Sequence, residues 1–169
     1  MIALSITDVK GFMKQLLTME SFDNFLVLEA VVATATTVTI DGRLNQEFLD
    51  NSDSDQENAE SAKDRLQTWG RVRPVCFELI KGKKLPLFFK VVLQLSGDNT
   101  SRFLNSINTS FSRNDVSGLY MNISFDRREL RIVTGTAVKS FSMDKSLEQE
   151  WDSMVKRFLT KNNIEFDIL

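Results

Sequence analysis

The residues in this sequence that are best suited to chemistry are basic, and six of them fall between positions 71 and 90. The same segment contains one acidic residue, Glu78, so its net charge is +5. Lysine and arginine attract phosphate through charge, and arginine can also bind it through two parallel hydrogen bonds. The pattern therefore predicts a site for an anion or for nucleic acid, formed by Arg71, Arg73, Lys81, Lys83, Lys84 and Lys90.

Two simpler interpretations compete with this hypothesis. The lysines at 81, 83 and 84 follow a predicted helix, where the helix dipole favours cations in any case. An acidic segment directly upstream can neutralise the basic cluster. Aromatic residues for base stacking are also few, because Trp69 and Phe77 are predicted to be core residues. Nucleic acid is therefore an alternative and not the leading interpretation.

Side chains that the chain lacks exclude much catalytic chemistry. There is no histidine, so there is no Ser-His-Asp or Cys-His pair and no imidazole base. One cysteine cannot make a zinc site, and the position of Cys76 in an apolar helical stripe predicts a core residue and not a reactive thiol. We therefore expect no metal and no cofactor.

Carboxylate chemistry is the catalytic alternative that stays open. Glu29 and Glu78 are acidic residues embedded in apolar runs, and paired carboxylates of the glycosidase kind can come from distant strands. The simpler interpretation is that Glu29 lies on a face of the sheet that contacts solvent. The acidic stretch from Asp50 to Glu60 does not match the calcium-loop pattern, so a solvated loop is favoured over a metal site there.

Length and composition predict a single domain over residues 1–169, and the order of its expected elements predicts an α+β fold with amphipathic helices packed against a mostly antiparallel sheet. The chain is 42% hydrophobic and 26% charged, which is sufficient for one folded core. Its first residues lack the basic and apolar regions of a signal peptide, and no apolar run approaches the ~20 residues of a membrane helix. With only one cysteine as well, we expect a cytoplasmic protein that does not contact a membrane.

The first 45 residues predict a strand, an amphipathic helix and a hairpin. Alternating apolar residues predict the strand at 2–6, and Thr7 is expected to cap the helix that follows. One face of this helix contains Val9, Phe12, Met13, Leu16 and Leu17. The hairpin is expected from the runs 25–33 and 38–40, with its turn near 34–36.

Residues 46–64 differ sharply from the rest of the chain. Seven acidic residues and one lysine give this segment a net charge of −6, and its middle contains no large apolar side chain. Such a segment cannot bury enough surface to offset its ordering entropy, so we predict a mobile acidic insertion. The remaining 150 residues then carry a net charge of +4.

The second half predicts a helix, a strand, a short helix, a three-stranded meander and a closing helix. The first helix spans about 69–81, with Pro74 in its first turn and Gly82 just past its end. The strand covers 85–95, the short helix lies near 103–107, and the meander uses 119–125, 130–134 and about 137–143. Asp144 is expected to cap the last helix, whose buried stripe includes Trp151.

The two halves of the chain also match each other at an offset of 91 positions. In this alignment Phe12 falls on Phe103 and Leu28 on Leu119. The resulting order of elements resembles one domain of a DNA polymerase sliding clamp, which contains two strand-helix-strands units. That resemblance implies that the helices at 7–17 and 99–108 lie side by side, and it makes a clamp-like DNA-associated protein an alternative.

Four segments carry a second resemblance. They are Thr39-Ile-Asp-Gly-Arg-Leu-Asn45, the run from Arg73 to Lys83, and Thr134-Gly-Thr136 followed by the run from Met143 to Trp151. These segments are similar to a family of small uncharacterised proteins from anaerobic Firmicutes. The resemblance implies a cytoplasmic bacterial protein and supplies no site residue.

Taken together, the residues favour a non-catalytic binding or interaction module. The sequence does not identify the partner: another protein is one candidate, and a second copy of the chain at an exposed strand edge is another, although no residue points to a homodimer. The alternatives are a clamp-like DNA-associated protein and a hydrolase that uses carboxylates.

Overall fold

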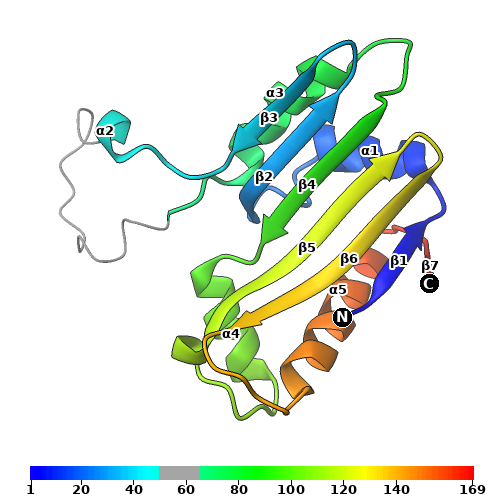
Figure 1. Ribbon diagram of the computed structural model, residues 1–169. Coiled ribbons are helices and arrows are strands. Elements are labelled where there is room, and N and C mark those ends of the chain that lie inside the picture. The colour runs from blue at the N-terminus through cyan, green and yellow to red at the C-terminus, as the bar shows by residue number, and fades with distance from the viewer. Residues whose placement is uncertain (50–64) are drawn as a thin grey trace.

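A computed structural model describes residues 1–49 and 65–169 of the chain (Figure 1). These residues contain seven strands and five α-helices, which confirms the predicted α+β class with an antiparallel sheet. The strands are β1 (Ala3–Ile6), β2 (Leu26–Ala33), β3 (Thr37–Asp41), β4 (Phe88–Gln94), β5 (Val116–Asp126), β6 (Glu129–Val138) and β7 (Phe166–Ile168). The helices are α1 (Val9–Thr18), α2 (Gln46–Leu49), α3 (Trp69–Ile80), α4 (Gly97–Ser106) and α5 (Ser146–Lys161).

All seven strands belong to one sheet, in the order β3-β2-β4-β5-β6-β1-β7. Every neighbouring pair is antiparallel. The predicted hairpins β2–β3 and β5–β6 are both present. Helices α1, α3 and α5 lie on one side of the sheet, behind it in Figure 1. No described helix lies over the side that faces the viewer.

The core fills the space between the sheet and these helices. Predicted alternation is confirmed in β4 and β5, where every second residue from Phe89 and from Leu119 is buried. Trp69 and Trp151 are completely buried, and their indole N–H groups donate to the carbonyl oxygens of Leu16 and Tyr120, at 2.8 Å and 3.0 Å. Each tryptophan therefore adds a satisfied polar contact to a large apolar area.

Two details of the helices differ from prediction. The cap of α1 is Asp8 and not Thr7, since the Asp8 carboxylate accepts from the Gly11 N–H at 2.9 Å. A carboxylate there also interacts favourably with the helix dipole. Pro74 lies inside α3 and not in its first turn. Pro74 has no backbone N–H, so α3 lacks one helical hydrogen bond. The helix forms nevertheless because Trp69 and Cys76, on either side of Pro74, are both buried.

The side chains of α3 are also more exposed than its apolar pattern suggests. Trp69, Val72 and Cys76 are buried, as predicted. Val75 and Phe77 are exposed, so the prediction that Phe77 is a core residue is wrong. The buried stripe is narrow because α3 contacts only α1 and β2 closely among the described elements.

The predicted third strand of the meander is wrong. β5 begins at Val116, inside the expected loop, so it offers β6 a partner along its whole length. β6 consequently runs on to Val138 without a turn. The chain then leaves the sheet, and Phe141 is 93% exposed. Sequence reasoning also missed β7, which pairs with β1 at the edge of the sheet.

β4 is shorter than the predicted strand at 85–95. Its partner β2 ends at Ala33, whose carbonyl accepts from the Leu87 N–H at 2.8 Å. No part of β2 is therefore left to pair with earlier residues, and β4 begins at Phe88. Leu85 and Leu87 are exposed in the loop before it.

The expected pairing of helices is also wrong. α1 packs on α3, whereas α4 lies at the opposite end of the sheet from α1 (Figure 1). There the Phe103 ring contacts Trp151 edge-on, with ring centroids 5.8 Å apart. The first strands of the two expected strand-helix-strands units, β1 and β4, also differ in position, because β4 lies inside the sheet and β1 near its edge.

The acidic insertion is described only in part. Residues Gln46–Leu49 form the short helix α2 where a mobile loop was predicted. The rest of that prediction, including the acidic stretch from Asp50 to Glu60, lies outside the described residues. Arg43 and Leu66 form an antiparallel bridge, which holds the two ends of the segment together. None of the helices in the described part of the chain is both long and apolar enough to cross a membrane.

Candidate binding surface

Arg73, one of the six predicted anion ligands, is partly buried and is held by an acidic partner. Its Nε donates to Asp23 Oδ1 at 2.6 Å and its Nη2 donates to Asp23 Oδ2 at 3.0 Å. The two side chains are only 19% and 23% exposed. This hydrogen bonding to Asp23 raises the pKa of Arg73 above its ordinary value. The pair joins α3 to the turn before β2, so its evident role is structural.

The other five predicted residues lie in different places. Lys81, Lys83 and Lys84 line one hollow of about 480 Å³ after α3, and Lys81 pairs there with Glu78 at 2.5 Å. Arg71 is exposed on α3 itself. Lys90 projects from β4, where its Nζ lies 2.9 Å from Glu29 Oε2. The structure therefore brings three of the six together, and their role in binding an anion stays a prediction.

Cross-strand rows of side chains cover the side of the sheet without helices. The register places Lys90, Ser124 and Arg131 opposite one another on β4, β5 and β6. Directly opposed residues project to the same face, so these rows form a continuous surface. We call it the open face. Its side chains are at least partly exposed apart from buried Val92, and they include Glu29, Val31, Phe88, Lys90, Val92, Asn122, Ser124, Arg131 and Val133.

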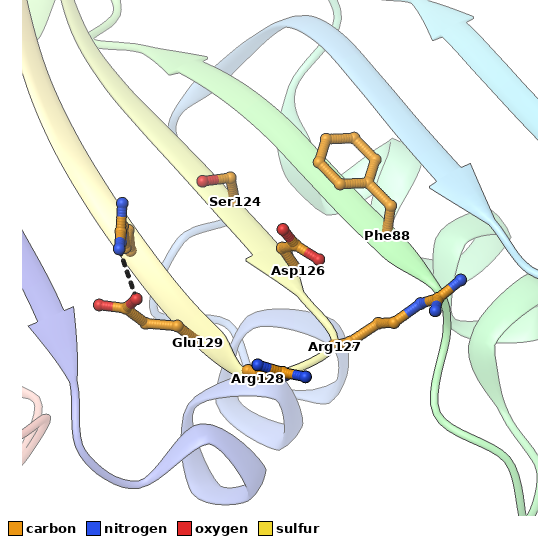
Figure 2. A pocket seen from close by; sticks show the side chains of 7 residues that line it. Phe88, Ser124, Asp126, Arg127, Arg128 and Glu129 are labelled. Carbon is orange, nitrogen blue, oxygen red and sulfur yellow. Dashed lines mark hydrogen bonds and ion pairs between the residues drawn. The ribbon is translucent and has the colours of Figure 1, made fainter.

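One end of the open face is hollowed beside the β5–β6 turn (Figure 2). Arg131 donates to Glu129 at 2.5 Å, and this hydrogen bond lowers the pKa of Glu129 and raises that of Arg131. Figure 2 shows Arg127 and Arg128 spreading from the turn in different directions. The hollow has a volume of about 620 Å³ and is lined by Phe88, Ser124, Asp126, Arg127, Arg128, Glu129 and Arg131.

A second hollow of about 490 Å³ lies further along the open face and holds two carboxylates. Glu29 and Asp41 stand directly opposite each other on β2 and β3. The Glu29 carboxylate pairs with Lys90, and both side chains are about 40% exposed, at 40% and 38%. Asp41 Oδ1 accepts from the backbone N–H of Arg43 at 3.0 Å. The carboxylates are thus solvated and engaged by donors, an arrangement suited to binding polar groups.

Other candidate groups are placed without ambiguity. Cys76 is completely buried, and desolvation raises the pKa of its thiol to about 11, so it is a core residue as predicted. Glu78 is exposed and paired with Lys81. Over the described ranges 1–49 and 65–169, no three acidic or cysteine side chains are grouped to hold a metal ion.

The sequence analysis did not identify the polar residues of β5 that lie on the open face. It used Leu119, Met121, Ile123 and Phe125 to define a strand and passed over the residues between them. Those residues, Tyr120, Asn122, Ser124 and Asp126, must project to the opposite face because side chains alternate along a strand. Their polar character was therefore a readable signal of an open face.

The fold and this surface define an α+β protein with one antiparallel sheet, helices on one side and an open face on the other. The chain belongs to DUF5721, a family of unknown function, whose model matches residues 15–167. This finding confirms the predicted membership of an uncharacterised family, while the expected bacterial range stays a prediction. No curated protein and no solved structure matched the chain.

Proposed function

We propose that this protein is a non-catalytic binding module that docks a protein partner on its open face. One observation carries the proposal: apolar Val31, Phe88 and Val133 lie partly exposed on this face among ion pairs, with no described helix above them. Apolar residues surrounded by charged ones are the usual composition of a protein–protein interface.

The charges of the open face support a protein partner over a nucleic acid. Lys90 is paired with Glu29, and Arg131 is paired with Glu129. The face therefore presents both signs of charge, which a protein surface can match group by group. Nucleic acid binding depends instead on cations that neutralise successive phosphates, and these two are already neutralised by carboxylates.

The size of the open face supports a transient partner. The seven strands of the sheet, spaced ~4.8 Å apart, and about six residues of rise give a surface of roughly 29 Å by 20 Å. The resulting ~600 Å² compares with ~800 Å² for each partner in an interface of standard size. This area is suited to a reversible complex, and a permanent homodimer through this face alone would need more.

The alternatives have less support. The observed strand order and the packing of α1 on α3 both differ from the arrangement expected for a clamp domain. These differences remove the main reason for a clamp-like DNA-associated role. A hydrolase would use Glu29 and Asp41, but Glu29 is neutralised by Lys90 in an open, solvated hollow. The proposal also treats residues 1–169 as one domain and places the protein in the cytoplasm, where the thiol of Cys76 would stay reduced.

Site-specific photo-cross-linking tests this proposal. The photoreactive residue replaces either Ser124, at the middle of the open face, or Lys14, which is exposed on α1 on the helical side. In cells that produce the chain, we expect a protein adduct from position 124 and none from position 14. An adduct with a second copy of the chain supports docking on this face as well. Adducts with nucleic acid alone, or the same adducts from both positions, would contradict the proposal.

A further inference from the structure

An apolar hollow on the helical side of the sheet is separate from the open face. It has a volume of about 360 Å³ and lies between α1, the end of α3 and the loop before β4. Six of its seven lining residues are apolar: Val9, Met13, Ile80, Leu85, Pro86 and Phe125, with Lys10 the seventh. Its volume and lining are in the range of small-molecule sites, which are concave, mostly apolar and about 300–1,000 Å³.

The residues that line this hollow are buried in its interior and more exposed towards its edge. Pro86 and Phe125 are buried, while Val9, Met13 and Ile80 are partly exposed. Leu85 is 75% exposed at the edge, although it contributes to the apolar lining. A single exposed leucine is ordinary on a protein surface. Beside an apolar hollow, the same side chain provides further area that a bound apolar chain can cover.

One lysine lines this apolar surface and three more line the hollow next to it. Lys10 is the only charged residue that lines it. The adjoining hollow after α3 shares Ile80 and Leu85 with it and adds Lys81, Lys83 and Lys84. No acidic residue lines either hollow. Within residues 1–49 and 65–169, Lys81 pairs with Glu78, whereas no carboxylate forms an ion pair with the other three lysines.

We propose that the apolar hollow binds an anionic amphiphile with one aliphatic chain, such as a long-chain carboxylate. The chain would occupy the surface formed by Val9, Met13, Ile80, Leu85, Pro86 and Phe125. The acidic group would lie against Lys10 at the edge, within the positive field of Lys83 and Lys84. Charge complementarity favours this ligand, because Lys10 lines the apolar hollow, three more lysines line the adjoining one, and neither lining contains a carboxylate to repel the acid. The site is independent of the open face and of its proposed partner.

Calorimetric titration with sodium octanoate and sodium decanoate, below their micelle concentrations, tests this inference. Each buried methylene contributes ~0.8 kcal/mol, which is about a fourfold gain in affinity. Decanoate should therefore bind about fifteenfold more tightly than octanoate. Decanol, which lacks the charge, should bind at least fivefold more weakly than decanoate. Equal affinity for all three compounds would contradict the proposal.

Matched variants locate the site. Lys10→Glu should weaken decanoate binding at least tenfold, while Lys14→Glu, an exposed lysine of the same helix outside the hollow, should change it less than twofold. Leu85→Asp changes an exposed residue and should also weaken binding without unfolding the protein, as checked by circular dichroism. The proposal fails if decanoate does not bind, or if Lys10→Glu and Lys14→Glu have the same effect. It fails equally if only an acidic amphipathic peptide binds the hollow.

Discussion

Replacing Arg73 with alanine should destabilise the protein, although the sequence suggests that this arginine is a ligand-binding residue. The substitution removes two hydrogen bonds to Asp23, of 2.6 Å and 3.0 Å, and leaves that carboxylate unpaired at 23% exposure. Hydrogen bonds to charged groups contribute roughly 1.5–3 kcal/mol each when well buried. Because both side chains retain some contact with water, we expect a total loss of about 2 kcal/mol.

The assay is urea and thermal unfolding followed by tryptophan fluorescence, since Trp69 lies in the same helix as Arg73. For a chain of this length, ~1 kcal/mol shifts Tm by about 2–4 °C, so Arg73→Ala should lower Tm by roughly 4–8 °C. Arg73→Lys should recover less than half of this loss because lysine cannot form the bidentate pair. Arg71→Ala, at an exposed position of the same helix, is the matched control and should change stability by less than ~0.5 kcal/mol.

A double-mutant cycle with Asp23→Ala completes the test. If the pair contributes as argued, Asp23→Ala should cost little in a protein that already carries Arg73→Ala, with a coupling free energy of about 1–2 kcal/mol. Independent effects of the two substitutions, or a Tm for Arg73→Ala equal to that of Arg71→Ala, would refute the reasoning.

Three further predictions concern the core. Burial raises the pKa of Cys76 from 9.0 to about 11, so the folded state disfavours the thiolate form of this residue. The stabilisation that results is fully present below pH 9 and is lost as the pH rises through 11. Unfolding free energy should thus fall by up to about 3 kcal/mol over that range, and Cys76→Ala should reduce the fall in pH-dependent urea titrations. Gly42→Ala should destabilise by more than ~2 kcal/mol, because the new Cβ would lie 1.7 Å from the Val27 carbonyl oxygen, whereas Gly97→Ala meets only ordinary contacts and should be tolerated in the same assay. Trp151→Ala should lose about 3–5 kcal/mol in urea unfolding, and a loss below 1 kcal/mol would show that α5 does not anchor the sheet.

Local periodicity was enough to predict most elements. Alternation from Leu119 to Phe125 identified β5, and the apolar stripe around Trp151 identified α5, because each of these elements buries one face. The extent of β6 could not be predicted in this way. It depends on the length of its partner β5, and an alternating strand does not reveal where its partner begins.

The candidate site was less predictable than the fold, for a related reason. The basic cluster was inferred from neighbouring residues in the sequence, but the partners that engage two of its members are distant. Asp23 is 50 positions from Arg73, and Glu29 is 61 positions from Lys90. The packing of α3 beside the turn before β2 brings the first pair together, and the pairing of β2 with β4 brings the second together. The charges of a local segment therefore could not show which cations stay free.

The most direct test of docking on the open face is the affinity of the partner captured at position 124. Ser124→Arg places a long charged side chain at the centre of the face, between Lys90 and Arg131. We expect this variant to bind the purified partner more than tenfold more weakly than the unmodified chain, a loss of at least ~1.4 kcal/mol. Lys14→Ala, on the helical side, should bind with unchanged affinity. An unchanged Kd for Ser124→Arg, in a protein shown to be folded, would contradict the account.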